Sequence, residues 1–411
     1  MSPAPEPWHT DKWFTSPWNF LAEVTRGFSF PKSVKVHDVT LRDGEQQAGV
    51  EFTKDDKIRI AEALAKAGVH RIEAGLPAVS KADEEAIKEI ARRGLPCEIF
   101  AFSRCLVEDV KRAVDCGVKG IVMEIPSSHH LIEQAYRWPV EVAIERSIEA
   151  TRYAHEQGLY VSFFPIDATR AGITQYLDMV ERISRDGHMD ALGLVDTFGV
   201  LSPHAVSFFV RKTRERIQKP LETHFHMDFG LGVANTVMAV AAGAEVIQTT
   251  VAGMGERAGN TPMEETVLTL LTMYGLDLGI QTERFTSLAR MVLERAQVQQ
   301  PSNRPVIGER LFHVESGIIA GWVRNVGENL TEAFPYRPEL VGQERPQIVL
   351  GKGSGVDSIA YRLDQLGMSA SNDEMLEILQ EVKARSLEKK RLLDDDEFLA
   401  IVERIVRKPR A

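Results

Sequence analysis

The chain has 411 residues, 44% of them hydrophobic and 26% charged, and this ordinary globular balance excludes an intrinsically disordered chain. The formal net charge of −10 argues against a nucleic-acid-binding protein, because such proteins concentrate basic residues on one face. Only three cysteines occur, Cys97, Cys105 and Cys116, and none forms a CxxC pair. That excludes a disulfide scaffold and a cysteine-built zinc site, and it favours a reducing cytoplasmic location. No membrane segment is expected, since no apolar run approaches the roughly 18 residues that a spanning helix needs.

The first 30 residues are polar and proline-rich, and they contain Trp8, Trp13 and Trp18. This composition predicts an N-terminal arm over residues 1–30 that packs on its own chain or on a partner.

From residue 34 onward, short strand-like runs alternate with amphipathic helical patterns. The first run, VKVHDVTL, is followed by the helical pattern of residues 54–68. Eight such strand-like runs follow one another, at 34–41, 71–75, 97–102, 120–126, 160–167, 191–197, 221–228 and 245–253. Eight strand–helix units in about 250 residues predict an α/β fold, a (β/α)8 TIM barrel, which we place over residues 31–285. An open doubly wound sheet is less favoured, because no GxGxxG follows the first strand.

The pattern changes after the barrel. Residues 297–310 are polar with two prolines, which indicates a linker, and residues 371–408 are charged and strongly helical. We therefore expect residues 286–411 to form a linker and mostly helical C-terminal subdomains that make a homodimer.

Reactive groups of TIM barrels lie at the C-terminal ends of the strands. His224 and His226 are two apart in the seventh predicted strand, so both side chains can point into the barrel. Asp43 follows the first strand, which barrel closure places beside the eighth. Two imidazoles and one carboxylate form a facial triad for a divalent cation, although a packed or surface histidine pair is the simpler alternative.

Other strand ends carry polar groups that suit an anionic substrate. Arg42 offers a fixed cation for a carboxylate or a developing enolate oxygen, and Thr197 ends the sixth strand. Glu73 and Asp196 are either orienting residues or partners in rim salt bridges. Further candidates for substrate or metal contact are Gln46, His130, Arg170 and, in the glycine-rich loop after the eighth strand, Asn260.

Four segments together resemble one known family. HDVTLRDGEQQAGVEF, HFHMDFGLGVANT, TTVAGMGERAGN and VLGKGSG are similar to the homocitrate, isopropylmalate and citramalate synthases, which are related to hydroxymethylglutaryl-CoA lyase. The similarity runs from about residue 34 to residue 355 and looks closest to short homocitrate synthases. It implies that Asp43, His224 and His226 bind Mg²⁺, Mn²⁺ or Zn²⁺, that Arg42 is the activating cation, and that Thr197 contacts the 2-oxo acid. From the lyase branch of the family, Asn260 is expected to join the metal ligands.

The chain departs from these synthases at positions that are polar in the family. Ile166 stands where they carry a catalytic glutamate, and Ala252 where they carry asparagine. Val314 and Gly353 each stand where they carry a histidine, and His313, one position away, is the candidate to substitute. These departures suggest a changed substrate or reaction.

Three functions are compatible with these residues and with the family resemblance. The first is condensation of acetyl-CoA, or another acyl-CoA, with a 2-oxo acid to give a 2-alkylmalate-type or homocitrate-like product. The second is a metal-dependent carbon–carbon lyase, which is less favoured because none of the cysteines lies where the lyases carry a reactive one. The third is a non-catalytic barrel that binds a metal and a carboxylate ligand.

Overall fold

The computed structural model describes residues 6–406. The chain divides into two compact units, a barrel unit of Trp18–Gln300 and an appended unit made of Met1–Pro17 and Pro301–Ala411. The extreme ends of the predicted arm and of the predicted C-terminal region, residues 1–5 and 407–411, lie outside the described residues.

The barrel unit is a closed ring of eight parallel strands in chain order. The ring closes because β1 pairs with both β2 and β8, with Asp38 opposite Ile72 on one side and Thr249 on the other. The strands are β1 (Lys35–Asp38), β2 (Arg71–Glu73), β3 (Glu98–Arg104), β4 (Gly120–Pro126), β5 (Tyr160–Ile166), β6 (Ala191–Asp196), β7 (Leu221–Phe225) and β8 (Val246–Thr249). The predicted TIM barrel is confirmed.

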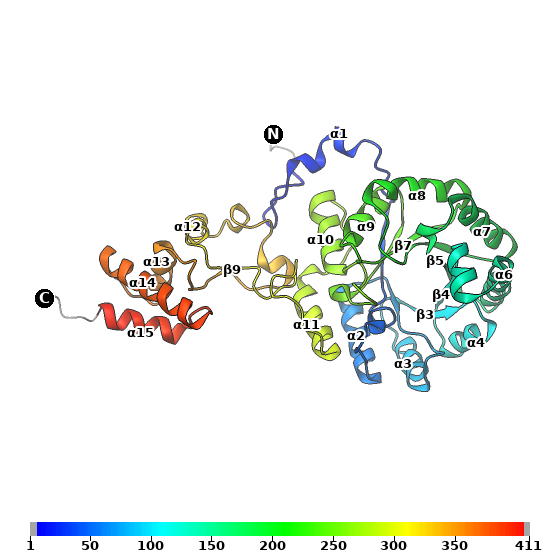
Figure 1. Cartoon of the computed structure of the whole chain (residues 1–411), viewed down its shortest axis with the longest axis horizontal. Helices are drawn as coiled ribbons and strands as arrows, with labels where there is room; N and C mark the ends of the chain where they lie inside the picture. The colour runs from blue at the N-terminus through cyan, green and yellow to red at the C-terminus, as the bar shows by residue number, and fades with distance from the viewer. Residues whose placement is uncertain (1–5, 407–411) are drawn as a thin grey trace. The chain divides into compact units, whose positions relative to one another are not determined.

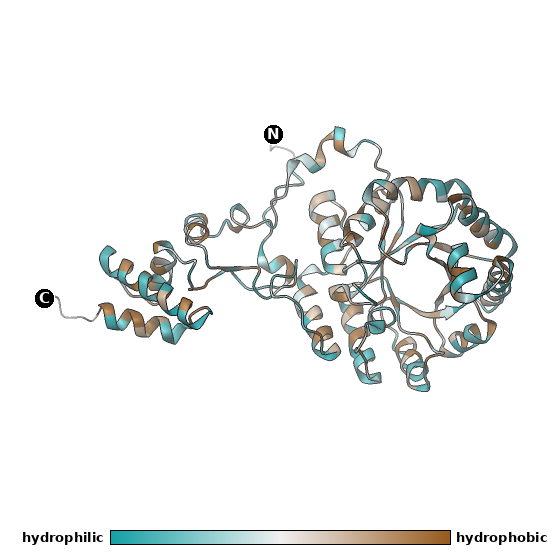
Figure 2. Ribbon diagram, in the orientation of Figure 1, coloured by the Kyte–Doolittle hydropathy of each residue, from teal (hydrophilic) through white to brown (hydrophobic). Residues whose placement is uncertain are grey.

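Helices follow the strands and surround the ring (Figure 1). The main ones are α2 (Lys54–Ala67), α3 (Lys81–Arg92), α4 (Val107–Cys116), α6 (Val140–Glu156), α7 (Ile173–Asp186), α8 (Pro203–Arg216), α9 (Gly232–Ala241), α10 (Met263–Tyr274) and α11 (Phe285–Ala296). Shorter helical turns are η1 (Pro17–Phe20), α1 (Ala22–Thr25), η2 (Gly44–Gln46), α5 (His129–Leu131), η3 (Ile132–Tyr136), η4 (Ala168–Arg170), η5 (Val251–Gly253) and η6 (Thr282–Arg284). Figure 2 shows brown, hydrophobic positions on the sides of these helices that face the strands.

Helix α2 illustrates how the sequence sets these boundaries. Thr53 and Asp56 form a reciprocal capping box that satisfies the first free N–H groups of the helix. Gly68 ends the helix with a φ of 93°, a left-handed conformation that costs little without a side chain. The helix therefore begins and ends where its capping residues stand.

Part of the barrel interior is a cluster of apolar side chains from neighbouring strands, namely Phe100, Phe102, Val122, Phe164 and Val195. Gly193 on β6 makes room for it, because a Cβ there would lie 2.8 Å from the Phe164 ring. Phe164 in turn stands 5.7 Å, centroid to centroid, from the His224 ring. Through Phe164, this apolar cluster therefore extends to His224 near the end of β7.

Six of the eight strands are shorter than predicted, and β1, β7 and β8 differ most. After Asp38 the chain turns, because the Asp38 carboxylate accepts hydrogen bonds from the backbone N–H and the hydroxyl of Thr40. Strand β7 stops at Phe225, and η5 replaces the last part of the predicted eighth strand. In each case the segment that follows the strand forms the rim.

The appended unit contains mainly helices, as predicted, together with one small sheet. Its helices are α12 (Gly317–Val326), η7 (Leu330–Glu332), η8 (Pro338–Val341), α13 (Val356–Gln365), α14 (Asn372–Lys389) and α15 (Asp395–Val406). The parallel strands β9 (His313–Val314) and β10 (Gln347–Ile348) were not predicted, since two residues give no readable alternation. A buried cluster that includes Ile378, Val382, Phe398 and Ile401 joins the last helices.

Residues 6–17 pack within the appended unit. Trp13 forms a bridge with Tyr336, and the Phe14 N–H donates to the Pro335 carbonyl at 2.9 Å. In the sequence between residues 6 and 406, no helix combines the length and the apolar character needed to cross a membrane.

Candidate metal centre

The two histidines come from β7 and the residue next to its end. His224 is the fourth residue of β7, and His226 bridges to Asn260 in the loop after β8. Their ring centroids lie 5.1 Å apart, and both side chains are buried. The two-residue spacing therefore places both imidazoles at the same end of the barrel.

Asp43 reaches the histidines because β1 lies two strands from β7 in the closed ring. Its Oδ2 atom stands 3.3 Å from His224 Nε2. One potential ligand atom from each of Asp43, His224 and His226 lies within 4.8 Å of the others. The structure thus brings together the three residues expected to bind a cation.

The hydrogen bonding around this group leaves atoms free for a cation. Within residues 6–406, the buried atoms His226 Nδ1 and Asn260 Oδ1 have no hydrogen-bond partner. The other side of the Asn260 amide is occupied, because its Nδ2 donates to Asp43 Oδ1 at 2.8 Å. Buried unpaired acceptors are costly, and a bound cation would satisfy them. The residues present therefore fit a divalent metal.

The charge states also suit a metal. Burial raises the pKa of the Asp43 carboxyl, but the Arg42 charge and a hydrogen bond from His224 outweigh it and hold that pKa well below its usual range. Burial and the neighbouring His224 lower the pKa of His226 to about 4. At neutral pH this gives a carboxylate and a neutral imidazole, which are the forms that bind cations.

A buried polar chain orients His224 from inside the barrel. His224 Nδ1 lies 2.8 Å from Gln248 Oε1, and Gln248 Nε2 donates to Glu222 at 3.4 Å. Glu222 also accepts from Arg71 at 2.8 Å. Because Nδ1 is engaged by Gln248, Nε2, which faces Asp43 at 3.3 Å, is the ring nitrogen that would bind a metal in place of that contact. Sequence reasoning missed this chain, although a polar residue at an inward-facing strand position could have indicated it.

Arg42 is fixed beside the group. Its Nε donates to Glu73 Oε1 at 2.6 Å and its Nη1 to Asp43 Oδ2 at 2.9 Å. The guanidinium also lies over the Phe102 ring at 4.4 Å, and Gln46 accepts a bond from it at 3.4 Å. Glu73 therefore fits both alternatives, because its carboxylate forms a salt bridge at the strand ends and also orients Arg42.

A cavity of about 320 Å³ opens next to these residues. Its lining consists of Arg42, Asp43, Gln46, Leu76, Phe102, Arg104, Glu124, Phe164, Ile166, Val195, Thr197, His224, His226 and Glu256. The predicted residues Arg42, Gln46 and Thr197 thus share one cavity with the triad.

His130 and Arg170 do not line this cavity. Both bind the buried carboxylate of Asp167, His130 at 3.1 Å and Arg170 at 2.7 Å. Asp167 has a φ of 63°, a strained conformation for a residue with a side chain, and its N–H donates to the Thr197 hydroxyl at 2.8 Å. Sequence reasoning missed Asp167 as the residue that joins these candidates.

The loop after β8 depends on a glycine. At Gly255, with a φ of 149°, a Cβ would lie 2.2 Å from Asn260 Nδ2 and 3.2 Å from Asp43 Oδ1. Gly255 therefore lets Asn260 approach Asp43. Ala252, one of the departures from the family, has a φ of 54°, and its N–H donates to the Glu264 carboxylate.

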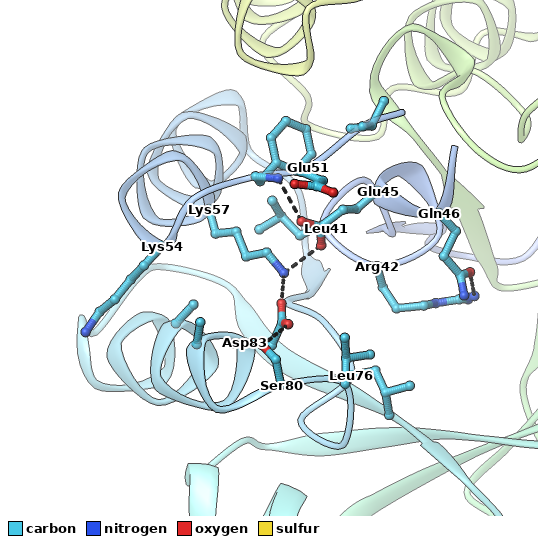
Figure 3. Close-up of a pocket in the computed structure, with 15 residues that line it drawn as sticks. Leu41, Arg42, Glu45, Gln46, Glu51, Lys54, Lys57, Leu76, Ser80 and Asp83 are labelled. Carbon is cyan, nitrogen blue, oxygen red and sulfur yellow. Dashed lines mark hydrogen bonds and ion pairs between the residues drawn. The ribbon is translucent and has the colours of Figure 1, made fainter. Parts of the chain in front are cut away.

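A second cavity of about 420 Å³ adjoins the rim and shares Arg42, Gln46 and Leu76 with the first (Figure 3). The buried Lys57 ammonium pairs there with Glu45, at 2.6 Å, and with Asp83. Glu45 also accepts the Phe52 N–H at 2.9 Å. This ion pair network joins the η2 turn that carries Gln46 to helices α2 and α3.

The remaining predicted positions have structural surroundings. Asp196 accepts the Thr169 hydroxyl and the N–H groups of Val200 and Leu201, so it holds the loop after β6. Cys105 is buried, and burial raises the pKa of its thiol to about 12, which leaves it unreactive. His313 lies on β9 of the appended unit, and its predicted catalytic role stays a prediction.

A closed eight-stranded parallel barrel with two histidines and a carboxylate at its strand ends defines a class, the TIM-barrel proteins equipped to hold a divalent cation. Within it, the chain belongs to the HMGL-like family, whose model matches residues 33–292. A second model, described as homocitrate synthase post-HMGL domain-like, matches residues 306–390.

Relatives and solved structures agree with this assignment. The chain is 39% identical to the homocitrate synthase AksA of Methanopyrus kandleri over 91% of this chain and 93% of that protein. It is 40% identical to a probable 2-isopropylmalate synthase of Ignicoccus hospitalis over 86% of this chain and 88% of that protein. The HMG-CoA lyase of Bacillus subtilis shares the fold, with a TM-score of 0.60 at 21% identity over 66% of this chain and 96% of the lyase.

Proposed function

We propose that this chain is a divalent-metal-dependent enzyme that joins acetyl-CoA, or another acyl-CoA, to C2 of a 2-oxo acid. The product is a 2-alkylmalate-type or homocitrate-like acid, and CoA is released. The observation that carries the proposal is the buried group of Asp43, His224 and His226 beside the fixed guanidinium of Arg42. The names of the relatives support it, since both are synthases of acids of this type.

The residues around the cavity divide the work of binding the 2-oxo acid. Asp43, His224 and His226 would hold the cation, with Asn260 beside them, and the cation would supply a Lewis acid for the substrate carbonyl. Thr197 lines the same cavity and offers its hydroxyl to the substrate carboxylate.

Arg42 stabilises the negative charge that develops on the substrate oxygen. It is already held by Glu73 and Asp43, so no reorganisation is needed as that charge appears. Gln46 lines the cavity beside it and is proposed as a further substrate contact.

The condensation removes one proton from the acetyl methyl group, forms one carbon–carbon bond and protonates the former carbonyl oxygen. Water then hydrolyses the thioester to a carboxylate and free CoA. Ile166 lines the cavity and has no group that can carry a proton. Within the barrel unit, the proposed proton carrier is Glu73, whose Oε2 atom is buried and has no hydrogen-bond partner among the described residues. The catalytic role of His313 stays a separate prediction.

Several finer points belong to the same proposal. Mg²⁺ or Mn²⁺ is the proposed metal, with Zn²⁺ as the third option, because two nitrogen ligands and one carboxylate accept all of these ions. A cytoplasmic location agrees with three free cysteines, and a homodimer is the proposed assembly.

The test measures free CoA with a thiol reagent while the protein is incubated with acetyl-CoA, Mg²⁺ or Mn²⁺ and a panel of 2-oxo acids. We expect release with at least one acid, and a loss of about a thousandfold or more in Asp43→Ala and His224→Ala, because removing the Lewis acid removes the main source of charge stabilisation. His204→Ala, at an exposed histidine on α8, is the matched control and should keep full activity.

Two results would contradict the condensation. One is the absence of CoA release with every 2-oxo acid of the panel while the metal is bound. The other is cleavage of a 3-hydroxy thioester without added acyl-CoA, which would establish the lyase alternative.

A further inference from the structure

One carboxylate in the cavity has no role in the metal centre. Glu124 lies in the middle of β4, between Val122 and Pro126, and its side chain lines the cavity. Strand pairing places it directly opposite Phe164 on β5 and Arg104 on β3. It therefore faces the substrate from the wall formed by β3, β4 and β5.

Most side chains on the Glu124 side of the cavity are apolar, and Arg104 is the exception. The same wall of the cavity is lined by Leu76, Phe102, Phe164, Ile166 and Val195. Within residues 6–406, no hydrogen bond and no ion pair within 4 Å engages the Glu124 side chain. A carboxylate facing an apolar wall without a partner costs free energy that a donor on a ligand can recover.

The nearby cations do not neutralise Glu124, because each is already paired. Arg104 binds Asp109 through two bonds, of 2.7 Å from Nε and 3.0 Å from Nη2. Arg42 binds Glu73 and Asp43. Burial raises the pKa of Glu124 to about 7 against the opposing charge of Arg42. At pH 8 this wall therefore presents a negative charge to whatever enters.

The orientation of a 2-oxo acid follows from the proposed function, on which this inference rests. If its carboxylate and carbonyl lie at Thr197, Arg42 and the triad, its side chain is left to face the wall of β3, β4 and β5. Apart from Arg104, which is bound to Asp109, that wall offers an apolar surface and a single anionic acceptor. A second carboxylate on the substrate would meet a like charge there, which strongly disfavours binding.

We propose that Glu124 determines substrate specificity: the chain selects a 2-oxo acid with one carboxylate and a hydrogen-bond donor on an otherwise apolar side chain, and it rejects 2-oxo acids with a distal carboxylate. The acid that leads to homocitrate-type products, 2-oxoglutarate, belongs to the rejected group. The replacement of a polar family residue by Ile166 on the same wall agrees with this selection.

The test compares three five-carbon acids at pH 8, namely 2-oxovalerate, 4-hydroxy-2-oxovalerate and 2-oxoglutarate. We expect the unaltered chain to use the hydroxy acid best and 2-oxoglutarate at least about 100-fold worse in kcat/KM, a ratio typical of a charge clash in a site. In Glu124→Gln the kcat/KM for 2-oxoglutarate should be less than about tenfold below that for the hydroxy acid. In Glu124→Leu the preference should move from the hydroxy acid to 2-oxovalerate.

Glu133→Gln is the matched control, since it makes the same change at an exposed carboxylate shortly after β4. It should leave the ranking of the three acids as it is. An unchanged ranking in both Glu124 variants, or an equal loss with all three acids, would overturn the specificity role.

Binding is measured separately by calorimetry with Mg²⁺ and no acyl-CoA, so that the inference does not depend on turnover. Altered discrimination in Glu124→Gln without any CoA release would support the specificity role and contradict the condensation. CoA release with unaltered discrimination would support the condensation and contradict the specificity role of Glu124. Failure of the unaltered chain to bind any of the three acids would overturn both.

Discussion

Arg42 is fixed between Glu73 and Asp43 before any substrate is present. A free arginine loses side-chain entropy when it binds a ligand, whereas this one is already held in a single geometry. The contact between the Arg42 guanidinium and the Asp43 carboxylate also holds Asp43, one of the proposed metal ligands, in place.

Gln248 provides a test of how His224 is oriented. In Gln248→Leu the imidazole loses the acceptor at Nδ1, so metal affinity should fall about 10–100-fold, as is usual for partners of metal-binding histidines. Titration with Mn²⁺ monitored by calorimetry measures this. Gln157→Leu, at an exposed glutamine after α6, should bind the metal like the unaltered chain. Equal affinities in both variants would contradict the orienting role.

Asp38 gives a pH dependence of stability. Burial raises its pKa from 3.8 to about 7, so the folded chain holds a proton there that the unfolded chain releases near pH 4. The contribution of the protonated Asp38 side chain to the free energy of unfolding is therefore fully present below about pH 4, and it is lost as the pH rises through about 7.

The variant Asp38→Asn has no titrating group at this position, so its free energy of unfolding should not fall in this way as the pH rises. From pH 5 to pH 8 the variant should gain roughly 2 kcal/mol of unfolding free energy relative to the unaltered chain, since each pKa unit corresponds to about 1.4 kcal/mol. Urea unfolding in EDTA at the two pH values measures the difference, in which the constant loss of the Thr40 hydrogen bonds cancels. Asp55→Asn, at an exposed position on α2, should follow the unaltered chain at both pH values. Parallel behaviour of Asp38→Asn would argue against a raised pKa.

At the scale of single residues, the sequence identified candidate side chains at or near strand ends, together with His224 inside β7, and missed Glu124 and Gln248. Asp43 and Thr197 come directly after a buried run, where barrels place reactive groups. Glu124 and Gln248 stand inside strands, and only the closed ring reveals that they face the interior. The strand register that brings them into place depends on pairing between distant segments, which local patterns do not encode.

At the scale of the elements, the shape of the cavity depends on how β5 and β6 pack. Gly193 accommodates the Phe164 ring, which stands edge-on to the His224 ring, and Phe164 pairs with Glu124 across β4 and β5. The existence and order of all eight strands could be predicted, because buried parallel strands give apolar runs of recognisable length. Their ends could not, because turns such as the one at Asp38 and Thr40 depend on individual hydrogen bonds.

Gly193→Ala tests this packing. The added methyl group would lie 2.8 Å from the Phe164 ring, so the ring must move, and the free energy of unfolding should fall by about 1–3 kcal/mol. Adding Phe164→Leu makes room for the methyl group, and the double variant should lose less than the sum of the two single changes. Urea unfolding of all four proteins measures the coupling. Strict additivity would show that the two side chains do not compete for the same space.

At the scale of the whole molecule, the chain consists of two units with separate cores. The composition predicted a change after the barrel. It did not predict that residues 6–17 belong with the C-terminal unit, since that association depends on contacts such as the one between Trp13 and Tyr336. The proposed catalytic residues are also divided, because His313 belongs to the appended unit and the metal ligands to the barrel unit.

His313→Ala examines whether the appended unit takes part in chemistry. If His313 transfers a proton, kcat should fall about 100-fold or more, within the range usual for acid–base groups, while Mn²⁺ affinity is unchanged. Activity and metal titrations on the same preparation separate the two effects. His9→Ala, in the N-terminal part of the appended unit, is the control and should retain kcat. Unaltered turnover in His313→Ala would assign proton transfer elsewhere.

The ring closure between β1 and β8 also determines when the proposed metal ligands can come together. Asp43 follows the first strand, whereas His224, His226 and Asn260 come from the last two strands and the loop after them. A ribosome must therefore release almost the entire barrel before all these ligands can meet. Uptake of the proposed metal would therefore be a late event in the life of each molecule, because a chain that lacks β8 and the loop after it has an incomplete set of these residues.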